Sequence, residues 1–171
     1  MKKFELTSEF VTFLGKKLFR IKALISFGNV EEGELGGYVE KEENLSNDGD
    51  AWVFGNAEVS GNARVSGNAE VSGNARVSGN AEVFGDARVF GNAMVSGNAD
   101  YATVQGFGSE YRATTFFRTK AGDIGVRCGC FYGTLEEFRA KVKETHRETK
   151  TAKEYLMVAD LMEFRFSKEE V

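Results

Sequence analysis

The sequence lacks proline and is poor in metal-ligating side chains, since its 171 residues include one histidine and two cysteines. A tetrahedral zinc site needs four ligands, usually from two separate pairs, and the only cysteine pair is Cys128 and Cys130. We therefore predict no metal site and no bound cofactor. The absence of proline is typical of a chain made mostly of regular elements.

Long apolar runs are also missing. The N-terminal segment does not contain the apolar core of a signal peptide, and no stretch approaches the length of a membrane span. Two cysteines without a secretion signal fit a reducing compartment, so we expect a cytoplasmic protein with no membrane partner. The net charge of −4 argues against nucleic acid as the partner.

What the sequence does contain is a six-residue unit repeated nine times without a gap, from Gly49 to Ala102. Its consensus is Gly-Asn-Ala-(Glu/Arg)-Val-Ser. In an extended strand Ala57 and Val59 face one side and Glu58 faces the other. Gly-Asn then turns the chain, because both residues tolerate positive φ. The unit predicts a short strand and a corner of a parallel β-helix.

The charged residues indicate how many units close one coil. Glutamate and arginine alternate from unit to unit, so two or four units per coil would stack like charges. Three units stack opposite charges, and each such pair contributes about 0.2–1 kcal/mol. The predicted pairs are Glu58–Arg76, Arg64–Glu82 and Glu70–Arg88. The alternation therefore favours a triangular coil.

The same register predicts columns of asparagine at the corners, where side-chain amides can hydrogen-bond from coil to coil. One column is Asn56, Asn74 and Asn92, and another is Asn62, Asn80 and Asn98. The interior holds only alanine and valine, so we expect no room for a ligand inside the coils.

The repeat resembles the hexapeptide-repeat family, whose members form left-handed parallel β-helices. The resemblance covers the central third of the chain and implies this fold and its hand. The flanks, with Gly33–Glu40 before the repeat and Cys128–Phe131 after it, resemble uncharacterised hexapeptide-repeat proteins of bacteriophages and prophages. That resemblance carries no established activity, and it implies a bacterial host cell as the setting.

We expect three regions in a mainly β fold. Residues 1–34 form an N-terminal β cap with a hairpin around Gly15, residues 35–112 form the left-handed parallel β-helix with three hexapeptides per coil, and residues 113–171 form an α+β lobe. Both flanking regions are predicted to cap the ends of the helix, because those ends expose unpaired strand edges.

The lobe is predicted to have the order ββαα. Its two strands flank the turn Lys120–Asp123. Capping boxes at Thr134–Glu137 and at Thr151–Glu154 predict the starts of two helices.

Large apolar residues interrupt the polar outer surface of the repeat. They are Trp52, Phe54, Phe84, Phe90 and Met94. Large exposed apolar side chains need a cover. Either the terminal regions cover them, because they cluster near the two ends of the repeat, or they bind a partner.

Acyl transfer is the chemistry that the family resemblance implies, with a histidine near the coils as general base and acyl-CoA between subunits. Here the coils contain no histidine, and we expect His146, in a charged segment, to be a solvated surface residue. We expect Cys128 and Cys130 to be buried structural thiols. Fold alone does not carry function, so we do not expect an enzyme.

The leading hypothesis is a non-enzymatic protein-interaction module, which the phage-like flanks suggest as an inhibitor of a bacterial defence protein. The alternatives are a structural protein that self-associates into a homo-oligomer, an acyltransferase of the hexapeptide family, and a sponge that binds nucleotide signals between subunits. The candidate partner-binding residues are the five outward apolar residues named above.

Overall fold

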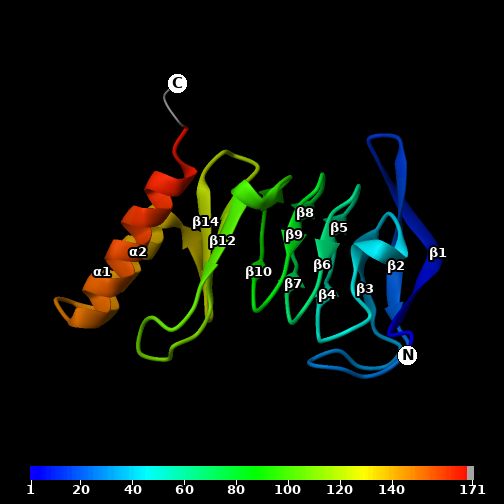
Figure 1. The fold of residues 1–171 in the computed structure, drawn as a ribbon, viewed down its shortest axis with the longest axis horizontal. Helices are drawn as coiled ribbons and strands as arrows, with labels where there is room; N and C mark the ends of the chain where they lie inside the picture. The colour runs from blue at the N-terminus through cyan, green and yellow to red at the C-terminus, as the bar shows by residue number, and fades with distance from the viewer. Residues whose placement is uncertain (169–171) are drawn as a thin grey trace.

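The computed structural model describes residues 1–168 and shows an elongated molecule with three parts along one axis (Figure 1). A β-hairpin and one short strand lie at the N-terminal end, and a stack of very short strands forms the middle. An antiparallel sheet and two helices lie at the other end. Each end of the stack is thus covered by a flanking region, as predicted.

The stack contains eight strands of two residues each. They are β4 (Trp52–Val53), β5 (Glu58–Val59), β6 (Arg64–Val65), β7 (Glu70–Val71), β8 (Arg76–Val77), β9 (Glu82–Val83), β10 (Arg88–Val89) and β11 (Met94–Val95). β5 pairs with β8, β6 with β9 and β7 with β10, all in parallel. The three charge pairs predicted from the sequence therefore face each other across neighbouring coils.

Two of these charge pairs are close enough to be ion pairs. Arg76 Nε lies 3.0 Å from Glu58 Oε2, and Arg88 Nε lies 3.6 Å from Glu70 Oε2. Pairs at this degree of exposure stabilise by about 0–1 kcal/mol each. Their larger effect is on register, because a slip by one unit would place like charges opposite each other.

Alanine and valine fill the interior, as predicted. Every alanine and valine from Ala51 to Val95 is at most 1% exposed. The glycine before each asparagine makes this stacking possible: Gly73 has φ of 70°, and a Cβ there would lie 2.9 Å from the Gly91 nitrogen of the next coil. Any larger residue would force the corners apart.

The N-terminal cap extends one side of the stack. β1 (Phe4–Phe13) and β2 (Lys16–Ala23) form an antiparallel hairpin, and β2 pairs with β3 (Leu35–Val39). β3 then pairs in parallel with β5, which joins the hairpin to the first side of the helix. The predicted hairpin is confirmed. A short 3₁₀ helix, Glu42–Asn44, precedes β4.

The C-terminal lobe has more strands than predicted. Its sheet contains β12 (Tyr101–Val104), β13 (Thr114–Arg118), β14 (Ile124–Cys128) and β15 (Phe131–Thr134), in that order and all antiparallel. The predicted β-helix, residues 35–112, includes β12, and the predicted lobe has one strand where the structure has β14 and β15. A second 3₁₀ helix, Asn98–Asp100, leads into β12. Residues 169–171 of the predicted lobe lie outside the described residues.

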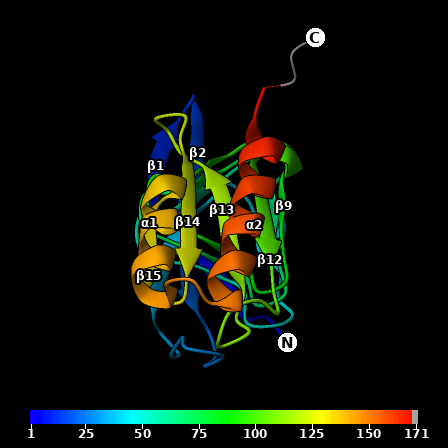
Figure 2. The ribbon, with the colours of Figure 1, turned by 90° about the vertical axis from the view of Figure 1, so that its left-hand side faces the viewer.

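Two helices cover the outer side of this sheet, α1 (Leu135–His146) and α2 (Lys150–Phe166) (Figure 2). The first predicted capping box is confirmed, since Thr134 Oγ1 accepts from Glu137 N and Glu137 Oε2 accepts from Thr134 N. The second is wrong: Thr149 caps α2 by accepting from Ala152 N, so the helix begins before Thr151. Within residues 1–168, no helix is both long and apolar enough to cross a bilayer.

Candidate functional site

Trp52 is covered by the N-terminal cap. Its side chain is fully buried, and its ring lies edge-on to Phe27 and Phe4, with centroids 5.3 and 6.2 Å away. The structure therefore contradicts the prediction that Trp52 binds a partner. The ring completes the apolar end of the helix instead, because the cap supplies aromatic side chains that pack against it.

Three of the other predicted residues are half-buried. Phe54 packs against the core of the helix. Phe90 contacts the C-terminal lobe: its ring lies edge-on to Tyr132 at 4.8 Å and beneath the Arg127 guanidinium, also at 4.8 Å. Met94 lies on the outer surface of the last coil and is half-buried. The terminal regions thus cover part of this apolar surface, which was one of the two sequence-based alternatives.

Phe84 is the only one of the five residues that stays largely open, at 59% exposure. Its neighbours in the chain add no exposed apolar side chain, since Val83 is buried and Gly85 has no side chain. A single exposed aromatic residue is common on soluble proteins and does not by itself define an interface.

A larger exposed apolar surface than that of Phe84 lies on α2, and no partner-binding residue was predicted there. Met157, Leu161 and Phe164 are 71%, 57% and 79% exposed. Spacings of four and three residues place them on one face of the helix. Figure 2 shows α2 in the outermost layer of the molecule. We call these three residues the α2 stripe.

The opposite face of α2 is firmly packed, so the stripe stands on a supported helix. Tyr155, Val158, Met162 and Phe166 are buried on that face, in one cluster with Phe116 of the sheet. The helix is therefore apolar on two faces. That excess over a single helical stripe is the sequence signal that could have revealed an exposed apolar face.

Arg139 of α1 holds two acidic residues of α2. Its Nη2 lies 2.9 Å from Asp160 Oδ1 and 2.7 Å from Glu163 Oε2. The hydrogen bond that Arg139 donates to Glu163, with a smaller contribution from the one it donates to Asp160, raises the pKa of Arg139 above its ordinary value despite partial burial. The Arg139 charge thus offsets part of the negative charge of the two carboxylates beside the stripe.

The remaining charges near the stripe are mostly positive. Lys150 and Lys153 precede it on α2, and Arg165 and Lys168 lie at its C-terminal end, all exposed. Across residues 1–168, no ion pair involves Lys150, Lys153 or Arg165. The α2 stripe therefore combines an apolar centre with basic ends.

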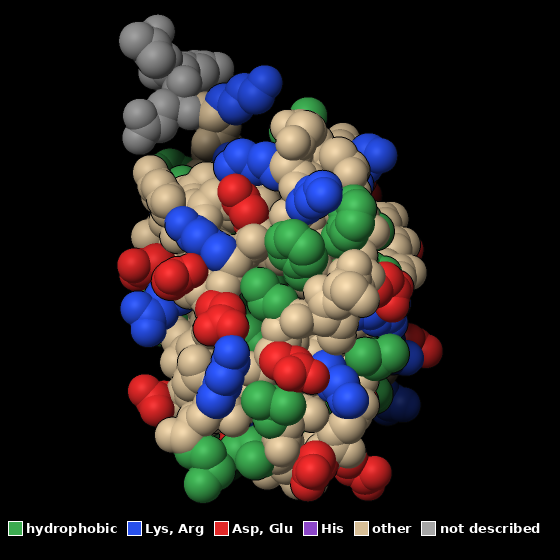
Figure 3. Space-filling view, turned by 90° about the vertical axis from the view of Figure 1, so that its right-hand side faces the viewer, with side chains coloured by type: hydrophobic (Ala, Val, Ile, Leu, Met, Phe, Trp, Pro, Cys, Tyr) green, Lys and Arg blue, Asp and Glu red, His purple; other side chains and the backbone are tan. Residues whose placement is uncertain are grey.

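The opposite end of the molecule looks different. In Figure 3 the apolar side chains of the N-terminal end are interspersed with acidic and basic ones. Phe10 and Leu14 are exposed there, but Lys17 lies over the Phe10 ring at 4.4 Å. This mixed surface supports an interface less than the stripe does.

His146 and both cysteines meet at a hollow of about 270 Å³ beside the two helices. The half-buried Cys128 Sγ accepts a hydrogen bond from Thr114 Oγ1 at 3.1 Å and lies 3.9 Å from the Tyr155 hydroxyl. Burial raises the pKa of Tyr155 to about 12. Cys130 is exposed, so the prediction of a buried thiol is wrong there, because Cys130 stands in the turn between β14 and β15.

His146 is half-buried rather than fully solvated, with its ring 5.8 Å from the Tyr155 ring. It belongs to the C-terminal lobe and not to the coils, which is where the family resemblance would require a general base. Among the described residues, no group of three or more histidine, cysteine or acidic side chains is arranged to hold a metal ion.

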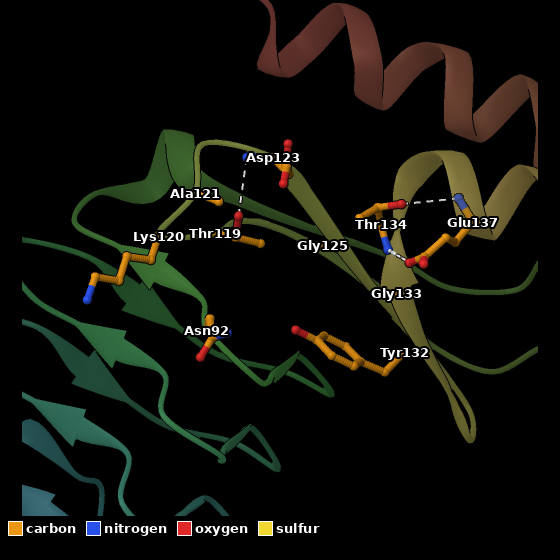
Figure 4. Close-up of a pocket in the computed structure, with 10 residues that line it drawn as sticks. All are labelled: Asn92, Thr119, Lys120, Ala121, Asp123, Gly125, Tyr132, Gly133, Thr134 and Glu137. Carbon is orange, nitrogen blue, oxygen red and sulfur yellow. Dashed lines mark hydrogen bonds between the residues drawn. The ribbon is translucent and has the colours of Figure 1, made fainter.

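A larger hollow, of about 530 Å³, opens between the last coil and the C-terminal lobe (Figure 4). Its polar lining includes Asn92, Lys120, Asp123 and Glu137, together with the ring of Tyr132. The backbone N–H of Lys120 donates to the backbone carbonyl of Asn92 at 2.8 Å, and this bond joins the β13–β14 turn to the last coil of the β-helix. The hollow is therefore a fixed feature of the contact between helix and lobe.

Comparison with known proteins identifies the repeat. Residues 87–99 match the family described as YdcK beta solenoid repeat. No curated protein matches the sequence. This match, with the stacked parallel strands that surround it, shows that the middle of the chain has a repeat β-helix, or β-solenoid, fold.

Proposed function

We propose that this protein is a non-enzymatic interaction module that binds a partner protein through the α2 stripe. The observation that supports the proposal is the exposure of Met157, Leu161 and Phe164 side by side on a helix whose other face is packed. Burying one such side chain stabilises by about 1.5–3 kcal/mol. Three together can supply the central anchors of an interface.

The charges around the stripe favour a foreign partner over a second copy of the chain. If two α2 helices packed antiparallel with Met157 opposite Phe164, Lys153 would lie opposite Lys168. A parallel pairing would place each lysine against itself. Like charges at such distances oppose association. The fitting partner is a protein with an apolar groove rimmed by carboxylates, which would accept the helix as in other helix-in-groove complexes.

The setting that we propose follows from the sequence resemblance. The partner is a bacterial host protein, with a defence component as the leading candidate, and binding occurs in the cytoplasm. The same resemblance underlies our proposal that the helix is a left-handed hexapeptide-repeat structure. Acyl transfer is the weaker alternative, because His146 lies in the lobe and the coils contain no histidine.

The test is a pair of matched variants. Tagged wild-type protein is used to purify a partner from bacterial lysate, and its affinity is then measured by calorimetry for wild type and for the Leu161→Ser, Phe164→Ser double variant. Loss of two anchors at about 1–2 kcal/mol each predicts affinity weaker by about 30-fold or more. The control is Leu14→Ser, which removes a leucine that is even more exposed than Leu161 and lies at the other end of the molecule.

Three outcomes would contradict the proposal. The double variant could bind as tightly as wild type, or Phe84→Ser, Phe90→Ser could abolish binding while the stripe variant does not, which would move the interface to the repeat. Light scattering could also reveal a homo-oligomer that dissociates in the double variant, which would favour self-association.

A basic interface further predicts that Lys153→Glu weakens binding and that affinity falls as salt rises.

A further inference from the structure

Two corners of the helix form the side-chain bonds that an asparagine column is expected to form. Asn62 Nδ2 donates to Asn80 Oδ1 at 3.2 Å. At the next corner Asn68 Nδ2 donates to Asp86 Oδ1 at 3.0 Å. In both cases the amide is used within the molecule, where it links one coil to the next.

The third corner differs, although its residues come from the same repeat. Asn56, Asn74 and Asn92 are exposed, and within residues 1–168 no hydrogen bond joins their side chains, so the ladder predicted for this column is not formed. Their amides are spaced by one coil each, about 4.8 Å. This corner therefore presents a row of donors and acceptors that the protein does not use itself.

These asparagines line a continuous groove. A hollow of about 320 Å³ runs along Asn56, Asn74 and Asn92 and is bordered by Met94. It shares Asn92 and Lys120 with the 530 Å³ hollow of Figure 4. We call the combined feature the amide groove.

The C-terminal lobe forms one wall of the amide groove, and the N-terminal hairpin reaches Arg76 of its lining. The tip of the β1–β2 hairpin and the β13–β14 turn rise along the same edge of the molecule (Figures 1 and 2). Phe13, at the hairpin tip, lies 4.2 Å from the Arg76 guanidinium, and Lys120 and Asp123 belong to the turn. The groove thus runs along the asparagine column and ends against the C-terminal lobe, an elongated shape that suits a short linear ligand.

The lining selects the chemistry of that ligand. Side-chain amides both donate and accept hydrogen bonds, which matches hydroxyl groups, since these also do both. The groove is lined by three carboxylates, those of Glu58, Asp123 and Glu137, and by two basic side chains, Arg76 and Lys120. Arg76 is already paired with Glu58, and this balance disfavours a polyanion. The Tyr132 ring is 40% exposed and offers an apolar surface of the kind that a sugar ring covers.

We infer that the amide groove binds a neutral oligosaccharide, with the free asparagine amides bonded to its hydroxyl groups and Tyr132 against one sugar ring. This binding is independent of the α2 stripe, which lies on the outer helix of the lobe. The interaction requires no covalent step, metal or cofactor.

The experiment titrates the full chain by calorimetry with neutral hexasaccharides, namely maltohexaose, cellohexaose and chitohexaose. At least one is expected to bind, and Asn74→Ala and Asn92→Ala are each expected to weaken it about tenfold, the equivalent of 1.4 kcal/mol. Asn62→Ala is the matched control, because it removes the same amide at a corner where the side chain is already bonded. Circular dichroism checks that all variants stay folded.

The inference is overturned if none of the hexasaccharides binds at millimolar concentration, or if Asn62→Ala weakens binding as much as Asn74→Ala. A polyphosphate that binds more tightly than every neutral sugar would also overturn it, because the groove would then be an anion site. Retained binding in the Leu161→Ser, Phe164→Ser variant is expected, which keeps this test separate from that of the partner interface.

Discussion

The two caps close opposite ends of one helix, and the ends differ in chemistry. Around the corners, each coil donates its N–H groups to carbonyls of the next coil, as from Arg64 to Ala81 and from Ser66 to Val83. At these positions the early coils therefore turn carbonyls toward the N-terminal cap, and the last coil turns amides toward the C-terminal cap. Buried backbone groups of either kind need a partner.

The N-terminal cap supplies side-chain hydrogen-bond donors to the carbonyls of the early coils. Asn44 Nδ2 donates to the carbonyls of Gly61 and Ala63, at 3.1 and 2.8 Å. Lys3 Nζ donates to the carbonyls of Gly49 and Ala51, at 3.2 and 2.8 Å. Both side chains are buried, which is unusual for a lysine and follows from the acceptors that surround it.

The C-terminal cap supplies mainly side-chain acceptors for the backbone amides of the last coil. Asn98 Oδ1 accepts from Glu82 N at 2.8 Å, and Thr115 Oγ1 accepts from Arg88 N at 2.9 Å. Where the last coil presents a carbonyl, that of Glu82, the Tyr101 hydroxyl donates to it at 2.5 Å. The first coil exposes mainly carbonyls and the last coil mainly amides, so different side chains are needed to cover the two ends of a parallel β-helix. The two caps are therefore not interchangeable.

The largest loss of stability is expected from a substitution at Asn44 of the N-terminal cap. Asn44→Leu removes the donor from two carbonyls at a fully buried position, and each buried group left without a partner costs about 1–3 kcal/mol. We expect a loss of about 2–4 kcal/mol in the free energy of unfolding, measured by urea denaturation. A loss below about 0.5 kcal/mol would mean that water replaces the side chain at no cost.

A smaller effect is expected at the other end. Thr115→Val keeps the volume of a buried side chain and removes the hydroxyl that accepts from the Arg88 amide and bonds the Thr103 hydroxyl, so the expected loss is about 1–2 kcal/mol. Thr103→Val is the control, because it removes the bond between the Thr103 and Thr115 hydroxyls, at 3.2 Å, and leaves the Thr115 acceptor of the Arg88 amide in place. Equal losses in the two variants would show that the Arg88 amide is not what Thr115 stabilises.

The smallest effect concerns the charge of Lys3. Burial lowers the pKa of Lys3 from 10.5 to about 8, with the carboxylates of Asp50 and Asp48 opposing that shift. Between these two pH values the unfolded chain binds more protons than the folded one, so stability rises with pH across this window. Urea titrations at several pH values should reveal the rise in wild type and its absence in Lys3→Met. A flat wild-type profile would contradict the assignment.

The sequence alone predicted the central helix because every part of the repeat meets a copy of itself. The spacing of Ala57 and Val59 sets the inner face, and the alternation of Glu58, Arg64 and Glu70 admits one register. Neither inference needs knowledge of distant parts of the chain. The pairing of Glu58 with Arg76 and the burial of the valines follow from periodicity and charge.

The candidate site could not be predicted in this way. Trp52 and Phe84 both interrupt the polar surface of the repeat, yet one is buried and the other exposed, because only one lies beneath a cap. On α2, local periodicity reveals apolar residues but not which face meets the sheet.

Tertiary structure therefore decided what the sequence left open. The docking of the sheet buried Tyr155 and left Leu161 in water, and the same lobe placed Lys120 beside the column of Asn56, Asn74 and Asn92. The physical reason is that exposure depends on which surfaces meet, and those contacts join segments that share no repeat. The sequence determined the helix and its register, whereas the packing of the caps determined which surfaces are free to bind.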